Sequence, residues 1–343
     1  MWLDASAPCC ASKAQSTAAG HRTGTLLARI GIDLGGTKCL GVVINEQGNQ
    51  LAEHRVPTPR GEGPVLDAIV EVATQLEAAG NPEGSHTVGV GYPGLIDAGG
   101  AVHFAPHLAG IEYLDLRTKL QERLGDATHV MVDNDANCAA WGERRFGAGE
   151  GAREVLLVTL GTGVGGGIVA NGALVRGQHG FAAEVGHMVV DHSGPPCPCG
   201  KNGCWERYAS GSGLGWLARQ AAYADVRSRT VELAGGDPEA VKGEHVAQAA
   251  AEGDAHALAV MHRFAWWLAL GLTNLTALLD PERIIIGGGL VESAGVWLDS
   301  AQASFDELLY AKKFRPPVKL VAANLGEYAG AIGAADLGAR PEI

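Results

Sequence analysis

Residues 29–38 read RIGIDLGGTK, an apolar strand that runs into a polar turn with two adjacent glycines. A second apolar stretch, Leu40–Asn45, leaves the turn, so the pattern predicts a β-hairpin and not the strand–loop–helix of a Walker P-loop. The turn offers bare amides, a hydroxyl and an ammonium to phosphate oxygens, and a carboxylate that can reach phosphate-bound Mg²⁺ through water. These candidate nucleotide-binding residues are Asp33, Gly35, Gly36, Thr37 and Lys38. Taken alone, the hairpin is equally compatible with an ordinary turn.

The same order of features returns in the second half of the chain. A strand at Glu154–Leu160 leads into residues 161–167, GTGVGGG, and a further strand follows at Ile168–Ala170. Two such hairpins in one chain predict a duplicated βββαβα architecture that holds a nucleotide between its halves. A buried strand from Arg283 also ends in glycines, on which an adenine ring could lie flat, although a plain strand-to-helix turn explains them too. The residues that these stretches add to the nucleotide site are Gly161, Thr162, Gly163, Gly288 and Gly289.

A compact group of metal-binding residue types lies at residues 187–204. Its members are His187, Cys197, Cys199 and Cys204. Three thiolates and one imidazole fill the four positions that Zn²⁺ prefers, which leaves no position for a water molecule. The spacing therefore predicts a structural zinc site and not a catalytic one.

Two carboxylates, Glu184 and Glu206, bracket this cluster. If His187 gives one ring nitrogen to zinc, the other nitrogen can face a ligand. We therefore hypothesise that zinc holds His187, Glu184 and Glu206 as a hydrogen-bonding floor for a polyhydroxy substrate. The simpler alternative is a zinc knuckle that only staples a loop. Earlier in the chain, a Pro-Gly turn after a predicted strand leaves the backbone of Gly94 accessible.

Residues 133–135, DND, close a predicted strand at Val130–Val132 and open a predicted helix at Ala136–Phe146. Ligands of α/β sheets gather at the carboxyl ends of strands, and a carboxylate there can accept a proton from a substrate hydroxyl. Considered by itself, however, this stretch is better explained by Asp133 or Asp135 capping the helix.

The composition describes a globular protein with room for two domains: 343 residues, 46% apolar, with a net charge of -12. The acidic balance argues against a nucleic-acid surface. The cysteines outside the cluster suggest no disulfide framework, so we expect a reducing, cytoplasmic setting. Residues 1–28 lack a secretory pattern and are expected to be a disordered leader, too short for a DNA-binding helix-turn-helix. The apolar stretch Phe264–Leu279 is expected to form a buried helix and not a membrane span.

Taken together, these motifs resemble the ROK family of sugar kinases, most closely its ATP-dependent glucokinases, from residue 29 to about residue 338. The resemblance implies an actin-like (ribonuclease H-like) two-domain α/β ATPase fold with a hinged cleft. It implies phosphoryl transfer from Mg-ATP to the 6-hydroxyl of a hexose, with Asp135 as general base. The positions that it implies for sugar binding are Gly94, Asn134, Asp135, Glu184, His187 and Glu206. The zinc ligands that it implies are His187, Cys197, Cys199 and Cys204. It also suggests a homodimer or a homotetramer.

The small domain is expected at residues 29–138 with the C-terminal helix 328–343, and the large domain at residues 139–327.

Several alternatives for the substrates and the activity stay open at this point. The acceptor could be mannose, fructose, N-acetylglucosamine or N-acetylmannosamine instead of glucose, because carboxylates accept hydrogen bonds from any suitably placed hydroxyl. A polyphosphate donor would favour a basic groove, of which the sequence gives no sign. A sugar-binding sensor without activity would leave the nucleotide turns and Asp135 unexplained.

Overall fold

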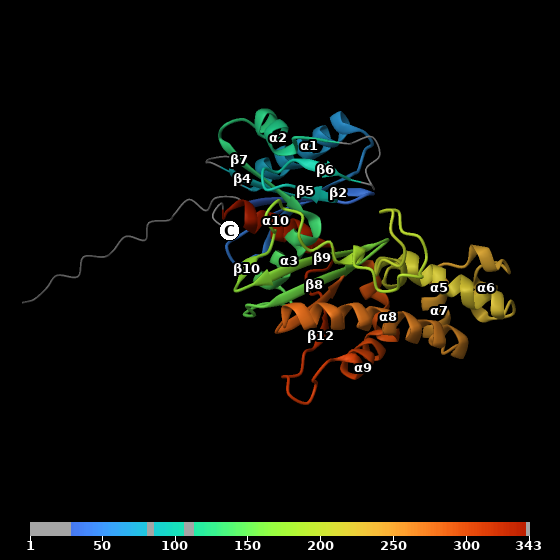
Figure 1. Cartoon of the computed structure of the whole chain (residues 1–343). Coiled ribbons are helices and arrows are strands. Elements are labelled where there is room, and N and C mark those ends of the chain that lie inside the picture. The colour runs from blue at the N-terminus through green and yellow to red at the C-terminus, as the bar shows by residue number, and fades with distance from the viewer. Residues whose placement is uncertain (1–28, 81–85, 106–112, 341–343) are drawn as a thin grey trace, which may run out of the picture.

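Two five-stranded sheets organise the computed structural model, which describes residues 29–80, 86–105 and 113–340 (Figure 1). In the first sheet, of order β3-β2-β1-β4-β7, β1 pairs antiparallel with β2 and parallel with β4. Its strands are β1 (Arg29–Leu34), β2 (Lys38–Ile44), β3 (Gln50–Pro57), β4 (His86–Tyr92) and β7 (Thr128–Asn134). A small hairpin of β5 (Leu95–Ile96) and β6 (Val102–Phe104) follows β4.

The second sheet repeats this plan in the order β10-β9-β8-β11-β12. Its strands are β8 (Val155–Leu160), β9 (Val164–Ala170), β10 (Ala173–Leu174), β11 (Arg283–Gly287) and β12 (Leu320–Ala322). In each half, three antiparallel strands precede two parallel ones. The predicted duplicated βββαβα architecture is therefore confirmed.

Helices cover both faces of each sheet, as parallel strands with two buried faces require. The α-helices are α1 (Glu62–Gly80), α2 (Leu116–Leu124), α3 (Asp135–Phe146), α4 (Glu206–Ala209), α5 (Gly211–Ala224), α6 (Arg229–Leu233), α7 (Gly243–Ala251), α8 (Ala255–Leu279), α9 (Leu298–Leu308) and α10 (Ala329–Gly338). The 3₁₀ turns are η1 (Val185–His187), η2 (Pro238–Ala240), η3 (Gly289–Val296) and η4 (Gly326–Tyr328). Along β8, Leu156 and Val158 join the core under α8, whereas Val155 and Leu157 face α3.

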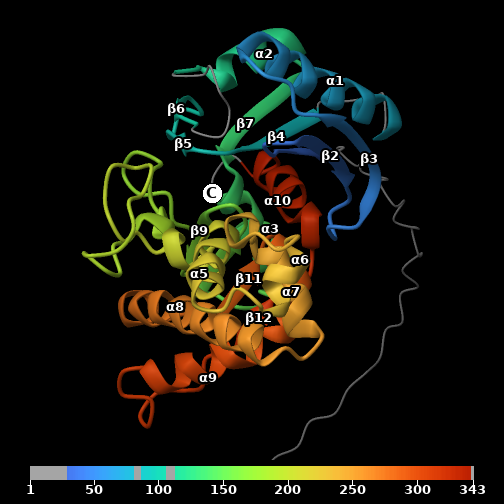
Figure 2. The same ribbon diagram turned by 90° about the vertical axis from the view of Figure 1, so that its right-hand side faces the viewer.

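Helices α3 and α10 lie between the two sheets and join the halves of the molecule (Figure 2). They approach closely because glycines remove side chains at their crossing: a Cβ at Gly333 would lie 1.7 Å from the Cys138 carbonyl oxygen. Helix α10 also packs directly on the first sheet, where a Cβ at Gly31 would lie 1.9 Å from the Ala331 carbonyl oxygen. The crossing is therefore fixed by backbone contact and tolerates little added volume.

A buried carboxylate pins the end of this crossing. Asp336 of α10 is fully buried, and its oxygens accept hydrogen bonds from Arg29 of β1 at 3.0 Å and from Arg145 of α3 at 3.0 Å. The indole of Trp141 and the guanidinium of Arg340 each donate a further bond at 2.9 Å. These contacts satisfy a charge that would be costly to bury alone, and they tie three elements together.

The structure corrects one predicted boundary. Residues 165–167 belong to strand β9 and not to the turn, and two of these glycines lie against α3: a Cβ would lie 3.3 Å from the Ala136 Cβ at Gly165 and 2.4 Å from the Ala140 Cβ at Gly167. Helix α2 begins at Leu116, because the Asp115 carboxylate caps it by accepting a hydrogen bond from the Thr118 amide.

Other expectations fall partly outside the described residues. The leader 1–28 and the last residues of the predicted C-terminal helix, 341–343, lie there. The apolar stretch 264–279 belongs to α8, as expected, and much of it lies in the core of the second half. Within the described residues, we find no helix that combines the length and the apolar character of a membrane span. The domain boundary predicted after residue 138 falls inside α3 and remains a prediction.

Candidate functional site

The first nucleotide turn joins β1 to β2 and leaves its backbone open. The Gly35 amide donates to the Lys38 carbonyl at 2.8 Å, which closes the turn, while Gly36 and Thr37 are exposed. A Cβ at Gly36 would meet nothing within 4 Å, so there is room for a ligand above it. The Lys38 ammonium forms an ion pair with Glu327 of η4. In this structure Lys38 is therefore engaged by a carboxylate from the chain itself.

The second turn opens into a pocket of about 530 Å³. Three predicted nucleotide-binding residues, Gly161, Thr162 and Gly289, line it together. The Gly211 amide at the start of α5 donates to the Gly161 carbonyl at 2.8 Å and fixes the turn against that helix. The remaining members are placed differently: Gly163 faces Glu206, and Gly288 packs on the backbone of Leu160.

The same pocket contains basic side chains that the sequence analysis missed. Arg207, Arg219 and Lys242 line it, with Glu244 as the carboxylate among its lining residues. They come from α4, α5 and the residue before α7, so no local motif reveals them. The net charge of -12 describes the whole chain and hides this local positive region.

Asp33 stands at the end of β1, in register with Gly91 of β4, which in turn pairs with Asp133 of β7. A Cβ at Gly91 would lie 3.4 Å from the Asp135 Cα and 3.5 Å from the Asp33 carboxylate, so the missing side chain brings these groups together. Burial, and then the charge of Asp135, raise the pKa of Asp33 to about 7 against the opposing effect of Lys38. Such a carboxylate suits a site where a divalent cation arrives with the ligand.

The unliganded Asp33→Asn variant should become more stable, relative to the unliganded wild type, as pH rises. The native pKa of about 7 lies above the ordinary 3.8, so the native state binds the extra proton between these values and loses stability as pH rises. Between pH 4 and pH 8, the difference in unfolding free energy between variant and wild type should therefore grow, by at most about 4 kcal/mol at 1.36 kcal/mol per pKa unit. Urea titrations without Mg²⁺ or nucleotide measure it. Asp299→Asn, on exposed α9, is the control, and a pH-independent difference for Asp33→Asn would contradict the prediction.

The 133–135 stretch separates its three side chains into different roles. Asn134 occupies the N-cap of α3, where its Oδ1 accepts from the Ala136 amide at 2.9 Å and from the Asn137 amide at 3.1 Å. The Asp135 Oδ1 also accepts from the Ala136 amide, at 2.9 Å. Asp133 is buried and accepts from the Arg176 Nε at 2.7 Å. Asp135 occupies the first turn of α3 beside Asp33. The N-cap position therefore belongs to Asn134 and to neither aspartate, although Asp135 also bonds to an amide of the first turn.

Asn134 also touches the predicted sugar-binding turn. Its Nδ2 donates to the Gly94 carbonyl at 3.1 Å, so these two predicted residues are neighbours. The turn at Gly94 packs against the end of β6, where a Cβ would lie 2.1 Å from the Phe104 carbonyl oxygen. The amide nitrogen carries a second N–H group that the Gly94 contact does not use.

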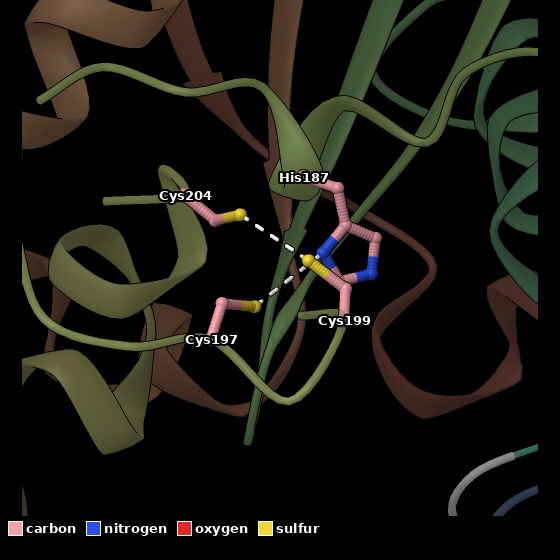
Figure 3. Close-up of side chains that lie close together, drawn as sticks. All are labelled: His187, Cys197, Cys199 and Cys204. Carbon is pink, nitrogen blue, oxygen red and sulfur yellow. Dashed lines mark hydrogen bonds between the residues drawn. The ribbon is translucent and has the colours of Figure 1, made fainter. Parts of the chain in front are cut away.

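The predicted metal ligands converge on one point (Figure 3). The ligand atoms of His187, Cys197, Cys199 and Cys204 all lie within 4.8 Å of one another, with 3.5 Å between the Cys199 and Cys204 sulfurs. The Cys197 sulfur lies 3.8 Å from His187 Nδ1. Tetrahedral zinc with bonds of about 2.3 Å to sulfur places sulfurs about 3.8 Å apart, so the donor set fits this metal. Figure 3 shows the second ring nitrogen of His187 turned away from the sulfurs.

The backbone of the loop holds this geometry. The Cys197 amide donates to the Lys201 carbonyl at 2.8 Å and the Gly200 amide to the Cys197 carbonyl at 3.0 Å, which folds the loop back on itself. Gly203 has a φ of 65°, and a Cβ there would lie 1.5 Å from the Asp191 carbonyl oxygen. A residue with a side chain would therefore displace the adjacent Cys204.

The two carboxylates that bracket the cluster in the sequence, Glu184 and Glu206, also lie near it in the structure. Glu206 Oε1 lies 3.1 Å from the Cys197 sulfur and 3.7 Å from His187 Nδ1. Glu184 is open to solvent, yet partial desolvation raises its pKa, opposed by His187 and reinforced by the charges of Asp135 and Glu206. Ala183, just before it, has a φ of 69°, an unfavourable value for alanine of the kind found at functional sites. The predicted floor residues and Asp135 are therefore electrostatic neighbours.

A buried tryptophan anchors the metal loop to helix α8. Trp205 is fully buried between Cys204 and Glu206, and its Nε1 donates to the Trp267 carbonyl at 2.8 Å. A Cβ at Gly271 of α8 would lie 2.1 Å from the indole. The bare helix surface at Gly271 is what allows the indole, and with it the loop, to lie so close.

We expect Gly271→Ala to destabilise the protein by about 1–3 kcal/mol, although alanine is the better helix former. The added methyl group would overlap the indole of Trp205, which is fully buried and has no room to shift. Thermal unfolding measures this loss of stability. Gly63→Ala in α1, where a Cβ would meet nothing within 4 Å, is the matched control and should be neutral or slightly stabilising. Equal behaviour of the two variants would refute the anchoring role.

Comparison with known proteins identifies relatives over nearly the whole described chain. A protein-family model described as the ROK family matches residues 29–340. A glucokinase of Streptomyces coelicolor is 41% identical over 316 residues, which are 91% of this chain and 98% of that protein. A glucokinase of Thermotoga maritima is 35% identical over 91% of this chain and 97% of its own length. A crystal structure of a ROK family glucokinase from Streptomyces griseus, in complex with glucose and AMPPNP, superposes with a TM-score of 0.78 at 40% identity, covering 90% of this chain and 98% of the other.

Proposed function

This chain belongs to the ROK family and is one of its sugar kinases, and on that premise we propose that it is an ATP-dependent glucokinase. The reaction is transfer of the γ-phosphoryl group of Mg-ATP to the 6-hydroxyl of glucose. The observation that carries the proposal is the meeting of two sites: a pocket at the Gly161–Thr162 turn and, through Gly163 and Glu206, the floor beside the metal cluster. The similar Streptomyces griseus enzyme, described with glucose and AMPPNP, supports this assignment.

The donor would bind between the two glycine turns. Thr162 and the backbone of Gly161 and Gly289 face the pocket, while the turn at residues 35–37 offers open backbone from the other half. Mg²⁺ on the donor would neutralise developing charge on the transferred phosphoryl group. The half-buried Asp33 stands where a water bound to that ion could be held. Cleft closure would exclude water that could otherwise take the phosphoryl group. We assign the two moving parts to residues 29–138 with the helix from 328, and to residues 139–327.

The acceptor sugar would rest on the floor that the metal loop presents. Glu184, Glu206 and the outer nitrogen of His187 would bind hydroxyl groups, with Asn134 and the backbone of Gly94 on the opposite side. One structural Zn²⁺ on His187, Cys197, Cys199 and Cys204 would keep this floor rigid. Asp135 would accept the 6-hydroxyl proton as that oxygen attacks the γ-phosphorus.

The experiment that tests the function is ADP release by the purified protein with Mg-ATP and a panel of hexoses. Turnover with glucose and little with mannose, fructose, N-acetylglucosamine or N-acetylmannosamine would support the glucokinase assignment. Turnover with another sugar would keep the mechanism and change the acceptor. If no hexose is phosphorylated with ATP but turnover occurs with polyphosphate, the donor assignment changes to polyphosphate. Glucose binding without turnover on any donor would replace the proposal by a sugar sensor. We also propose a cytoplasmic homodimer or homotetramer, which light scattering of the full chain would measure.

A further inference from the structure

The donor pocket faces an electrostatic problem that the predicted residues do not solve. Asp33 and Asp135 lie on either side of Gly91, and the Glu206 carboxylate faces Gly163, so carboxylates lie close to both glycine turns. A nucleotide donor would bring further negative charge to this place. Binding it therefore requires cations supplied by the protein, besides those that arrive with the nucleotide.

Lys38, the cation that the sequence analysis assigned to this task, is held elsewhere. Its ammonium pairs with Glu327, which also accepts a bond from Arg55 at 3.0 Å. Glu327 lies in η4, immediately before α10, on the side of the first half. The opposite half must therefore supply a cation if the donor phosphates are to be balanced from both sides.

Of the three basic residues that line the donor pocket, one stands out. Arg219 already donates to the Val241 carbonyl at 3.0 Å, and Lys242 is largely exposed beside Glu244. Arg207 is half-buried, and within the described part of the chain its buried Nε has no hydrogen-bond partner. A buried guanidinium nitrogen without an acceptor is costly, and an acceptor brought by a ligand or by water would relieve that cost.

The position of Arg207 in the chain suits this role. Its backbone amide donates to the Cys204 carbonyl at 2.9 Å, so the metal loop fixes it directly. It follows Glu206, whose carboxylate faces the cluster and the Gly163 turn, while Arg207 lines the pocket with Gly161 and Thr162. Two consecutive residues of α4 thus face the two sites, and one rigid loop sets the distance between them.

We propose that Arg207 is a donor-binding residue whose guanidinium binds the phosphates of the nucleotide from the second half of the molecule. This inference rests on the proposed function and names a further residue of its donor site. A guanidinium suits the task because it stays charged and presents several N–H groups in a plane that matches phosphate oxygens. The zinc loop would then position both substrates, the sugar through Glu206 and the donor through Arg207.

The test compares Arg207→Gln and Arg207→Lys with the wild type in nucleotide binding and in steady-state kinetics. We expect Arg207→Gln to raise the KM for Mg-ATP about 10-fold or more, the scale of a hydrogen bond to a charged group. The KM for glucose should stay within about twofold of the wild-type value, because Glu206 is unchanged. The zinc content should stay at one per chain, because the four candidate zinc ligands are unchanged. Arg207→Lys keeps the charge and should lose less. Arg227→Gln, an exposed arginine outside the pocket, is the matched control.

Calorimetric titration with ADP and with adenosine separates phosphate recognition from damage to the pocket. The loss in Arg207→Gln should appear with ADP and be absent with adenosine. An equal loss for both ligands, an unchanged affinity for ADP, or a rise in the KM for glucose that matches the rise for ATP would each overturn the proposal. These titrations need no turnover, so they decide the role of Arg207 even if the wild-type protein phosphorylates no hexose. If Arg207→Gln does not fold, Arg207→Lys should lose a smaller part of its ADP affinity and none of its adenosine affinity, and an unchanged ADP affinity in that variant would overturn the proposal.

Discussion

Replacing Asp135 by asparagine is expected to lower kcat by about 100-fold or more, while the affinity for glucose changes only a few-fold. The carboxylate lies in the first turn of α3, beside Asp33 and at the carboxyl edge of the first sheet. As general base, it would take the proton of the attacking hydroxyl, a contribution on the order of 10²–10⁴ in rate. Asparagine keeps the shape and the polar contacts of the side chain but cannot accept that proton. The loss should therefore fall on the chemical step and leave ground-state binding largely intact.

The structure offers a control that separates chemistry from helix capping. Asn134 caps α3, so the Asp135→Asn change leaves the cap in place. Asp115→Asn makes the same chemical change at the start of α2, and asparagine caps helices as well as aspartate does. Steady-state kinetics with glucose and Mg-ATP, together with glucose titration, should show the rate loss in Asp135→Asn alone. A rate near that of the wild type in this variant would remove Asp135 from its role.

The second large effect is expected at the metal cluster. Cys204→Ser should release most of the zinc and weaken glucose binding about 10-fold or more. Three thiolates and one imidazole are needed for a closed tetrahedral site, and loss of one ligand also frees the loop that carries Glu206. Zinc is measured by elemental analysis of the purified protein, and glucose affinity by calorimetry. Cys39→Ala, a buried cysteine of β2 outside the cluster, is the control for thiol loss and should keep one zinc per chain.

Chelation gives the same comparison without a mutation. Removal of zinc should weaken glucose binding, and added Zn²⁺ should restore it. If the metal-free protein binds glucose as tightly as the zinc-loaded one, the cluster is only a staple and the floor hypothesis fails. If Cys204→Ser keeps its full zinc content, the assignment of that ligand is wrong.

Local sequence patterns predict much of the fold and of the candidate metal cluster. The repeated strand–turn–strand segments at 29–45 and 154–170 predict the duplicated sheets, because backbone pairing of adjacent strands is decided by nearby residues. The spacing of Cys197, Cys199 and Cys204 predicts the metal cluster, since tight loops with glycine bring such residues together. His187 lies ten residues before Cys197, and the sequence suggests that it joins the three cysteines. In the structure, the β-bridge between Val189 and Cys204 brings it to them.

Other features depend on contacts between distant residues and leave no local signal. The pairing of Lys38 with Glu327, the anchoring of Trp205 on Gly271 and the crossing of α3 with α10 each join segments far apart in the chain. Asn134 takes the helix cap because Asp133 lies inside β7 and α3 begins at Asp135, a boundary that three polar neighbours in sequence do not settle.

The sequence by itself determined the fold class, the cluster of candidate metal ligands and the chemical types at the two turns, because these depend on spacing and on residue chemistry. Tertiary structure alone decided that Arg207, Arg219 and Lys242 share one pocket with Thr162, that Gly165 and Gly167 lie against α3, and that Asp33 lies beside Asp135. The physical reason is the same in each case. Periodicity and spacing encode the pairing of near neighbours, whereas burial and electrostatic environment arise only when distant surfaces meet.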